Sequence, residues 1–421
     1  MKLGEFLVVL DLLAAGTGAF DVEAATRAYL ETLQGPAKEQ SDAYFEGGYY
    51  LLVFGTAVTV LVDWLILRFR MAIAFRDLAE RIFKGAFGAT WLTASLYFLV
   101  STLIALPWTL YTGFFREKQY DLMDQSFGAW LSDQLIGYVI ALAIFPLLIA
   151  IVYLVIRKAP QTWWVTGTAV AGLFFFIGTT LAPVFISPLF NTYTELEQGP
   201  LRDRLVTMAA QYDVPAENIY VFDQSKQDKR ISANVSGFGP TIRISLNDNL
   251  LERTSEEEIV AVMGHELGHY VMNHGAWRVA TIMAIFALGL FAISRIAPWL
   301  IARKQAQWGV RDVSDPASIP VFALILAVYF FLATPATNGI IRLQENQADA
   351  FGLIAAQEPD GFARAAMRLS EYRKLEPSAL EEFLFYTHPS GENRVRRSMQ
   401  WKADNVPGAV IETPPEGYLD Q

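Results

Sequence analysis

The sequence predicts a mainly α-helical, multi-pass membrane protein with a small α+β segment between its spans. Hydrophobic residues make up 53% of the 421-residue chain and charged residues only 18%, which is unlike a soluble protein. Six apolar stretches are long enough to cross about 30 Å of hydrocarbon at about 1.5 Å per residue. One polar segment separates the fourth stretch from the fifth, and it contains strand-like alternation of apolar and polar residues.

The first residues, 1–19, have the features of a secretory signal peptide. Lys2 precedes an apolar run from Phe6 to Ala15, and the small residues at 16–19 suit a cleavage site. We therefore expect this segment to be removed, with a short first helix as the alternative.

Residues 20–186 form an N-terminal region with four spans, and residues 276–343 hold two more. The part before residue 48 is polar and helix-prone, and the connections between the first four spans are short. The six predicted transmembrane helices are Tyr49–Phe69, Phe87–Tyr111, Gln134–Ile156, Trp163–Ile186, Ala276–Ala302 and Ile319–Leu343.

Residues 187–275 form the polar segment. We expect an amphipathic helix near Leu201–Tyr212 and strands at Asn218–Phe222 and Thr241–Leu246. The intervening stretch Ser232–Pro240 is rich in small residues, which predicts a loop or a bulged edge.

A capping-box pattern begins the next helix. Thr254 and Glu257 have the T-x-x-E spacing and stand just ahead of an apolar run. We expect this helix to continue through His274 into the fifth span, so the side chains that it carries should lie near the membrane boundary.

This helix carries a metal-binding pattern, His265-Glu266-Leu267-Gly268-His269. The two histidines stand at i and i+4, so both can bind one ion from the same helix face. The pattern predicts one Zn²⁺ per chain, with an open position at which water is activated, and Glu266 as the general base. The chain has no cysteine, so the remaining ligands must be nitrogen or oxygen. A chance HExxH on an exposed helix is the alternative.

The third ligand is expected in the C-terminal segment, residues 344–421. Glu345 and Asp349 are four residues apart at the end of the sixth span, so they share a helix face. We expect Glu345 to bind the metal and Asp349 to orient a histidine. A solvated acidic pair is the alternative. The last dozen residues are expected to form a loose tail.

Three further polar residues have open interpretations. His274 lies about 500° around a continuous helix from His269, so it should face away from the metal and cap or border the membrane. His388, in a Thr-His-Pro turn, is either a loop histidine or a donor to the developing oxyanion. Arg394 is expected to hold the substrate or the acidic pair, with a plain surface position as the alternative.

A peptide substrate needs a place to bind in extended form. The strand Thr241–Leu246, with Asn234 upstream, could present an unpaired edge to which a peptide adds as a further strand. A small sheet that merely packs against helices is the alternative.

These features together predict a peptidase embedded in the lipid bilayer that hydrolyses membrane-associated polypeptides. The net charge of −10 comes without a basic cluster, which argues against nucleic-acid binding. A channel or transporter with a structural zinc site is the alternative from another class of protein. It is disfavoured because the spans show no obvious inverted repeat and few buried charges.

The chain resembles the Ste24-type CAAX prenyl protease 1 family, the integral-membrane zinc metallopeptidases of peptidase family M48. The resemblance runs from about Phe45 to Arg397. It rests on the stretches Leu106–Tyr111, Pro188–Asn191, Asp223–Lys226, Asn234 with Gly237-Phe238, Asn249–Leu251, Gly264–His269, Glu345–Phe351 and His388-Pro389.

This resemblance implies a ring of transmembrane helices enclosing a chamber, closed by a zincin-like domain. It implies His265, His269 and Glu345 as ligands and Glu266 as catalyst. It also implies that Asp349 supports a ligand, that His388 and Arg394 lie near the transition state, and that Asn234 binds the substrate backbone. The implied substrates are lipid-modified CAAX-type polypeptides, and membrane-protein quality control without a prenyl substrate is the alternative.

The loop charges predict an orientation in the membrane. The loops after the first, third and fifth spans are rich in Lys and Arg, whereas the loop 112–133 is mainly acidic. By the positive-inside rule, the three basic loops are cytoplasmic and the catalytic side is outside. We therefore expect a bacterial inner-membrane protein whose active site opens to the periplasm.

Overall fold

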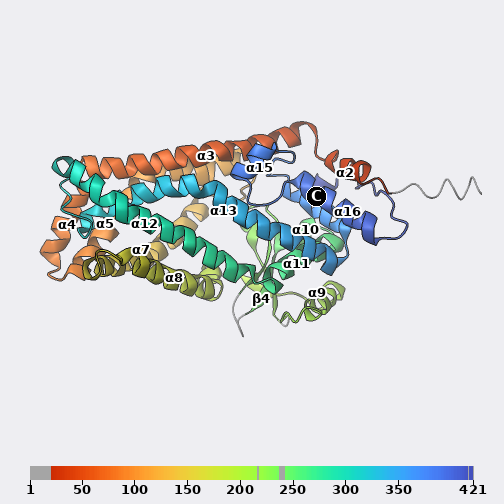
Figure 1. Cartoon of the computed structure of the whole chain (residues 1–421). Helices are drawn as coiled ribbons and strands as arrows, with labels where there is room; N and C mark the ends of the chain where they lie inside the picture. The colour runs from red at the N-terminus through yellow and green to blue at the C-terminus, as the bar shows by residue number, and fades with distance from the viewer. Residues whose placement is uncertain (1–19, 216–217, 237–241, 416, 421) are drawn as a thin grey trace, which may run out of the picture.

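The computed structural model describes residues 20–215, 218–236, 242–415 and 417–420. The predicted signal segment, 1–19, lies outside these residues. Long helices form one end of the molecule, and the sheet and the shorter helices form the other (Figure 1). The two ends match the apolar and polar parts of the sequence.

The six predicted spans are confirmed, because six helical segments in the described residues are long and apolar enough to cross a membrane. The helices that carry them are α3 (Gly35–Arg68), α5 (Ala86–Leu110), α7 (Phe127–Lys158), α8 (Trp163–Leu181), α12 (His274–Trp308) and α13 (Ile319–Ala356). The helices α3, α7, α12 and α13 extend well beyond their apolar stretches, because the flanking polar residues also favour helix, whereas α8 ends five residues before its predicted end.

Shorter helices border these spans. The helix α4 (Met71–Ile82) follows α3, and a π-helical turn, Tyr111–Phe115, joins α5 to α6 (Arg116–Gln119). A second π-helical turn, Ala182–Ile186, ends α8. The most apolar 18-residue window of the segment Trp163–Leu189, which includes most of α8, has no buried residue, as expected for a segment that faces lipid.

The polar segment forms a four-stranded sheet in the order β1-β2-β4-β3. Its strands are β1 (Tyr193–Glu195), β2 (Ile219–Phe222), β3 (Ala233–Ser236) and β4 (Arg243–Asn247). The strand β4 pairs in parallel with β2 and antiparallel with β3. Helix α9 (Pro200–Ala210) confirms the predicted amphipathic helix, and Leu205 packs with Ile244 and Leu246 in the core of this domain.

One prediction for this sheet was wrong, because β4 is paired on both sides and cannot offer a free edge. The stretch Ser232–Pro240, predicted as a loop or a bulged edge, contains β3, which is the edge strand. The apolar alternation of β4 reflects burial, because Ile244 and Leu246 are both fully buried. The small residues of β3 fit an edge position, where less apolar surface is covered.

The predicted capping box is real but lies one residue further along. Ser255 and Glu258 make the reciprocal bonds that begin α11 (Glu256–Val271), just after α10 (Asp248–Arg253). The hydroxyl of Thr254 instead donates to the Leu250 carbonyl at the end of α10. Thr254 therefore closes one helix and Ser255 opens the next.

The prediction that this helix runs on through His274 was wrong. Helix α11 ends at Val271, and Asn273 adopts a left-handed conformation with φ of 54° before α12 begins at His274. Asparagine tolerates this conformation better than most residues, so it marks the break. The chain changes direction here, so the side on which His274 lies no longer follows from the periodicity of α11.

The C-terminal segment closes the polar domain with α14 (Pro359–Leu369), α15 (Ala379–Phe385) and α16 (Gly391–Asn405). The N-terminal helix α2 (Val22–Leu30) packs against α14 and α16. Tyr418 is 4% exposed in the same cluster, so the loose tail predicted there is wrong at this residue.

Candidate metal centre

Glycines allow α11 and α13 to cross at close range. A Cβ on Gly264 would lie 2.8 Å from the carbonyl oxygen of Gly352, and one on Gly352 would lie 2.8 Å from the amide nitrogen of His265. No larger residue fits either position without moving backbone. This contact brings the first histidine of the HExxH pattern beside the acidic residues of α13.

Three predicted ligands converge at this crossing. The Nε2 atoms of His265 and His269 lie 3.2 and 3.3 Å from Glu345 Oε2, and 3.1 Å from each other. One donor atom from each of the three residues lies within 4.8 Å of the others, and no other such group of three occurs among the described residues. His265 and Glu345 are almost completely buried.

The protonation of the two rings tests whether a cation fits. His265 Nδ1 lies 2.8 Å from Asp349 Oδ1, an acceptor, so it carries the hydrogen and leaves a lone pair on Nε2. His274 Nε2 donates to Gln347 Oε1 at 3.1 Å, so its Nδ1 accepts from His269 Nδ1 at 2.9 Å. The Nε2 atom of His269 then also carries a lone pair.

Two imidazole lone pairs and one carboxylate oxygen therefore face one point. Glu345 Oε2 is a buried atom without a hydrogen-bond partner among the described residues, while Arg278 holds the other oxygen at 3.2 Å. Three acceptors that face one another repel unless a cation lies between them. The residues present thus fit a metal ion with nitrogen and oxygen ligands.

A buried ion pair supports this arrangement from behind. Arg394 donates from Nε and Nη2 to the two oxygens of Asp349, at 3.0 and 2.6 Å, and Asp349 is fully buried. Of the interpretations left open for Arg394, the structure shows contact with the acidic pair. Its charge acts on the site through Asp349 and His265.

His274 is the residue that sequence reasoning missed. On a continuous helix it would face away, but the break at Asn273 turns its ring back onto His269. The signal was present, because an asparagine directly before a new polar turn is a helix-stop pattern. Arg278, on the next turn of α12, was also not predicted.

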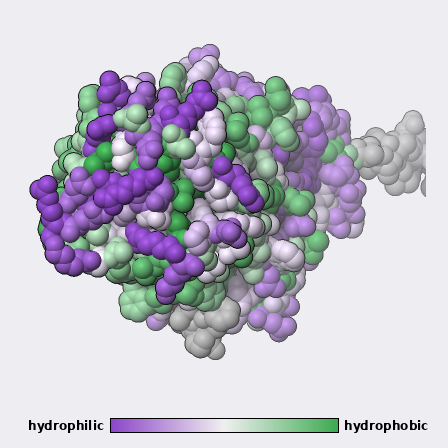
Figure 2. Space-filling model, turned by 60° about the vertical axis from the view of Figure 1, so that its left-hand side comes forward, coloured by the Kyte–Doolittle hydropathy of each residue, from purple (hydrophilic) through white to green (hydrophobic). Residues whose placement is uncertain are grey.

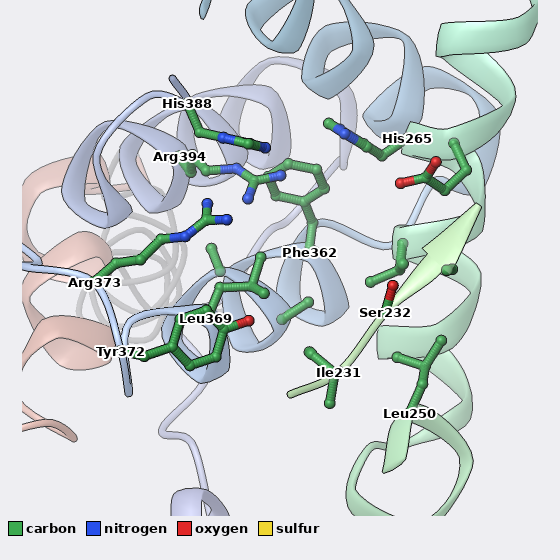
Figure 3. A pocket seen from close by; sticks show the side chains of 15 residues that line it. Ile231, Ser232, Leu250, His265, Phe362, Leu369, Tyr372, Arg373, His388 and Arg394 are labelled. Carbon is green, nitrogen blue, oxygen red and sulfur yellow. The ribbon is translucent and has the colours of Figure 1, made fainter. Parts of the chain in front are cut away.

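A cavity of about 200 Å³ adjoins the ligands and is lined by both Glu266 and His388 (Figure 3). Burial raises the pKa of Glu266 above its usual value. His388 Nε2 lies 3.3 Å from Glu345 Oε2. Burial, together with the nearby charge of Arg373, lowers the pKa of His388 to about 3, so its imidazole is neutral and can donate one hydrogen bond.

The predicted substrate residue Asn234 lies on β3, opposite Ser245 of β4. Its neighbours Ser232 and Ala233 line the cavity, but Asn234 is not part of the lining. The structure thus brings the edge strand to the site, with Asn234 next to the residues that line the cavity.

A second, larger cavity of about 650 Å³ lies between α3, α13 and the polar domain. It shares Ile231, Ser232, Tyr372 and Arg373 with the first cavity. The cavity beside the spans therefore adjoins the cavity beside the predicted ligands at these four residues.

The chain matches two family models. Residues 195–402 match peptidase family M48, and residues 36–192 match the CAAX prenyl protease N-terminal region, described as five membrane helices. The first match contains every predicted ligand and Glu266.

Several curated proteins are similar over most of their length. CAAX prenyl protease 1 of Saccharomyces cerevisiae is 31% identical over 322 residues, which is 70% of this chain and 69% of the relative. A Bacillus subtilis protein named as an uncharacterized metalloprotease, YhfN, is 28% identical over 314 residues, covering 73% and 72%.

A solved structure has the same fold. The crystal structure of S. mikatae Ste24p superposes with a TM-score of 0.74 at 21% identity, covering 89% of this chain and 94% of that one. The predicted ring of helices around a chamber, closed by a small α+β domain, is confirmed by this likeness.

Proposed function

Since the chain belongs to peptidase family M48 and is a multi-pass membrane metalloendopeptidase of the CAAX prenyl protease 1 type, we propose that its ion is Zn²⁺, held by His265, His269 and Glu345. The observation that carries this proposal is the convergence of three lone-pair donors on one buried point. Two imidazoles and one carboxylate are a common protein ligand set of catalytic zinc. The family match favours the protease over the channel or transporter alternative.

Each residue around the ion has a proposed role in peptide hydrolysis. When bound, Zn²⁺ supplies a Lewis acid that acidifies water and polarises a carbonyl. Glu266 accepts the proton of the attacking water and later passes it to the leaving amine, a role that its raised pKa suits. His388, kept neutral, donates a hydrogen bond to the developing oxyanion.

The remaining predicted residues position these groups. Asp349 fixes the hydrogen of His265 on Nδ1, and Arg394 holds Asp349 in place. The edge strand β3 offers unpaired backbone groups to an extended peptide, and Asn234 binds that peptide's backbone next to the cavity.

The proposed substrates are membrane-associated polypeptides, including lipid-modified ones. The larger cavity supports this, because residues of α3 and α13 line it and it shares four lining residues with the cavity beside the proposed ligands. Several relatives are named as CAAX prenyl proteases. A quality-control protease without a prenyl substrate would use the same chemistry, and cleavage of matched prenylated and unprenylated peptides distinguishes the two.

The proposed location is a bacterial inner membrane, with the catalytic side in the periplasm. Three basic loops lie together at the end far from the metal ligands: Arg70 donates to carbonyls of Ala306 and Gln307, and Arg157 donates to that of Ser314. Hydrophilic side chains gather at this end among apolar ones (Figure 2). A reporter fused after Gln421 should be active only outside the cytoplasm; activity only inside would refute the orientation.

The test of the chemistry is a variant that keeps the ligands. Glu266→Gln should retain metal and lower kcat by about 10²- to 10⁴-fold, because only the proton acceptor is lost. Glu256→Gln, an exposed position on the same helix, is the matched control. The measurements are metal content by mass spectrometry and peptide cleavage in detergent. Retained cleavage in Glu266→Gln, or an ion other than zinc in the active protein, would overturn the corresponding part of the proposal.

A further inference from the structure

Arg373 stands where three cavities meet. It lies in the connection between α14 and α15, and it lines the cavity beside the metal ligands, the larger cavity beside the spans, and a third of about 200 Å³ that also reaches His388. In the close-up its guanidinium points into the cavity toward Arg394 and His388 (Figure 3). No other residue of the described chain lines all three of these spaces.

The other arginines near the site have acidic partners. Arg394 pairs with Asp349, Arg230 with Glu117, and Arg368 with Glu258. Arg373 makes no ion pair or side-chain hydrogen bond with any residue that the structure describes, and its one aromatic contact is the neighbouring Tyr372 ring at 5.9 Å. The carboxylates of Glu345 and Asp349 act on its charge only from a distance, so the guanidinium has no direct acidic partner beside the cavity.

A guanidinium without a direct acidic partner, in a partly enclosed cavity, favours an anionic ligand. Burial lowers the pKa of Arg373 from its usual value, but arginine remains charged in proteins. Its planar fork of donors matches the two oxygens of a carboxylate, and such a pair is stronger where water is partly excluded. A polypeptide in the cavity can carry that carboxylate.

We propose that Arg373 is a specificity residue that binds a carboxylate of the polypeptide substrate. The carboxylate is either the substrate's C-terminus or an acidic side chain a few residues from the scissile bond. This inference rests on the proposed function, since it assigns the charge preference of the same site. It predicts that neutral peptides are poorer substrates than matched peptides with a negative charge.

The backbone at Arg373 is held without its side chain. Ser41 of α3 donates its hydroxyl to the carbonyls of Ser370 and Arg373, at 2.6 and 3.3 Å. Loss of the guanidinium should therefore leave the loop and the metal site in place. Arg373→Gln and Arg373→Lys are suitable variants, and Arg396→Gln is the matched control, because Arg396 is a surface arginine of α16 paired with Glu392.

The test uses one short peptide that the full-length, zinc-loaded wild type cleaves, prepared in three forms. These forms end in a free carboxylate, in a neutral amide, or in an amide with one added glutamate. A charged hydrogen bond contributes about 1.5 to 3 kcal/mol, so the wild type and Arg396→Gln should prefer one charged form by about 10- to 100-fold in kcat/KM, mainly through KM. Arg373→Gln should reduce that ratio to near one, and Arg373→Lys should restore part of it.

The outcomes separate the two sources of the carboxylate and the two proposals. A preference for the free acid assigns the C-terminus, and a preference for the glutamate form assigns an acidic side chain. Equal cleavage of all three forms by the wild type, an unchanged ratio in Arg373→Gln, or loss of zinc from that variant would overturn the role of Arg373. Cleavage that survives Glu266→Gln would instead overturn the proposed function.

Discussion

The close crossing of α11 and α13 makes a quantitative prediction for Gly352→Ala. The added Cβ would lie 2.8 Å from the His265 amide nitrogen and 3.0 Å from its Cα, whereas ordinary contacts begin at 3.4 Å. The two helices must therefore separate by about 0.6 Å at this point. Zinc ligands tolerate displacements of only about 0.2 Å, so His265 and Glu345 can no longer reach one ion without strain.

The expected cost follows from the energy of overpacking. Forcing a methyl group into a packed contact costs about 1–3 kcal/mol, which the free protein can relieve by letting the helices separate. Metal binding must draw them together again, so zinc affinity should fall by about 5- to 150-fold. Chelator competition measures this affinity directly, and metal-saturated samples report cleavage.

Gly339→Ala is the matched control, because it lies on the same helix and its Cβ would have no heavy atom within 4 Å. Alanine favours helix over glycine by about 1 kcal/mol, so this variant should be as stable as the wild type or more so. If Gly352→Ala bound zinc as tightly as Gly339→Ala does, the glycine contact would not set the ligand geometry.

Three further predictions concern the groups around the ligands and the metal itself. Asp349→Asn should leave Arg394 buried without its partner and destabilise the fold by about 3–5 kcal/mol, measured by denaturant unfolding; a loss below about 1 kcal/mol would contradict this. His274→Phe should weaken zinc binding by about 10- to 100-fold while its helix still forms, and unchanged affinity would mean that the His269 contact has no effect. Chelation should lower the midpoint of thermal unfolding and abolish cleavage, because an ion held by two helices stabilises the folded state. Added Zn²⁺ should restore both. A midpoint that chelation does not change would show that the ion does not stabilise the fold.

Much of the fold could be predicted because its signals are local. Apolar length defines the six spans, and the i, i+4 spacing of His265 and His269 brings the two proposed ligands to one helix face. Glu345 and Asp349 share a helix face for the same reason, and the structure finds both at the site. In each case a rule about neighbouring residues was sufficient.

The wrong predictions arose where the outcome depends on distant residues or on a single backbone conformation. One residue, Asn273, ends a helix whose periodicity otherwise continues, so His274 was assigned to the wrong side. The prediction that β4 has a free edge was wrong because β3 pairs with it, and the residues of β4 do not reveal this pairing. No sequence pattern distinguishes Arg373. Its proposed role depends on the lack of an ion pair with any described residue, which only the folded structure reveals.

The length of α13 has a mechanical consequence. Its 38 residues span about 57 Å, and Glu345 lies about 39 Å from the first of them. A tilt of only about one degree at the membrane end would therefore move Glu345 by about 0.7 Å, more than a zinc ligand tolerates. Pro335 lies inside this helix, ahead of Glu345, and removes one backbone hydrogen bond there. Bending should therefore concentrate at Pro335. Bilayers of different thickness would then tilt the part of α13 before Pro335, while the part that carries Glu345 keeps its position. Cleavage by Pro335→Ala, measured in vesicles of short- and long-chain lipids, should depend on thickness more strongly than cleavage by the wild type; equal dependence would show that this proline does not uncouple the enzyme from the elasticity of its membrane.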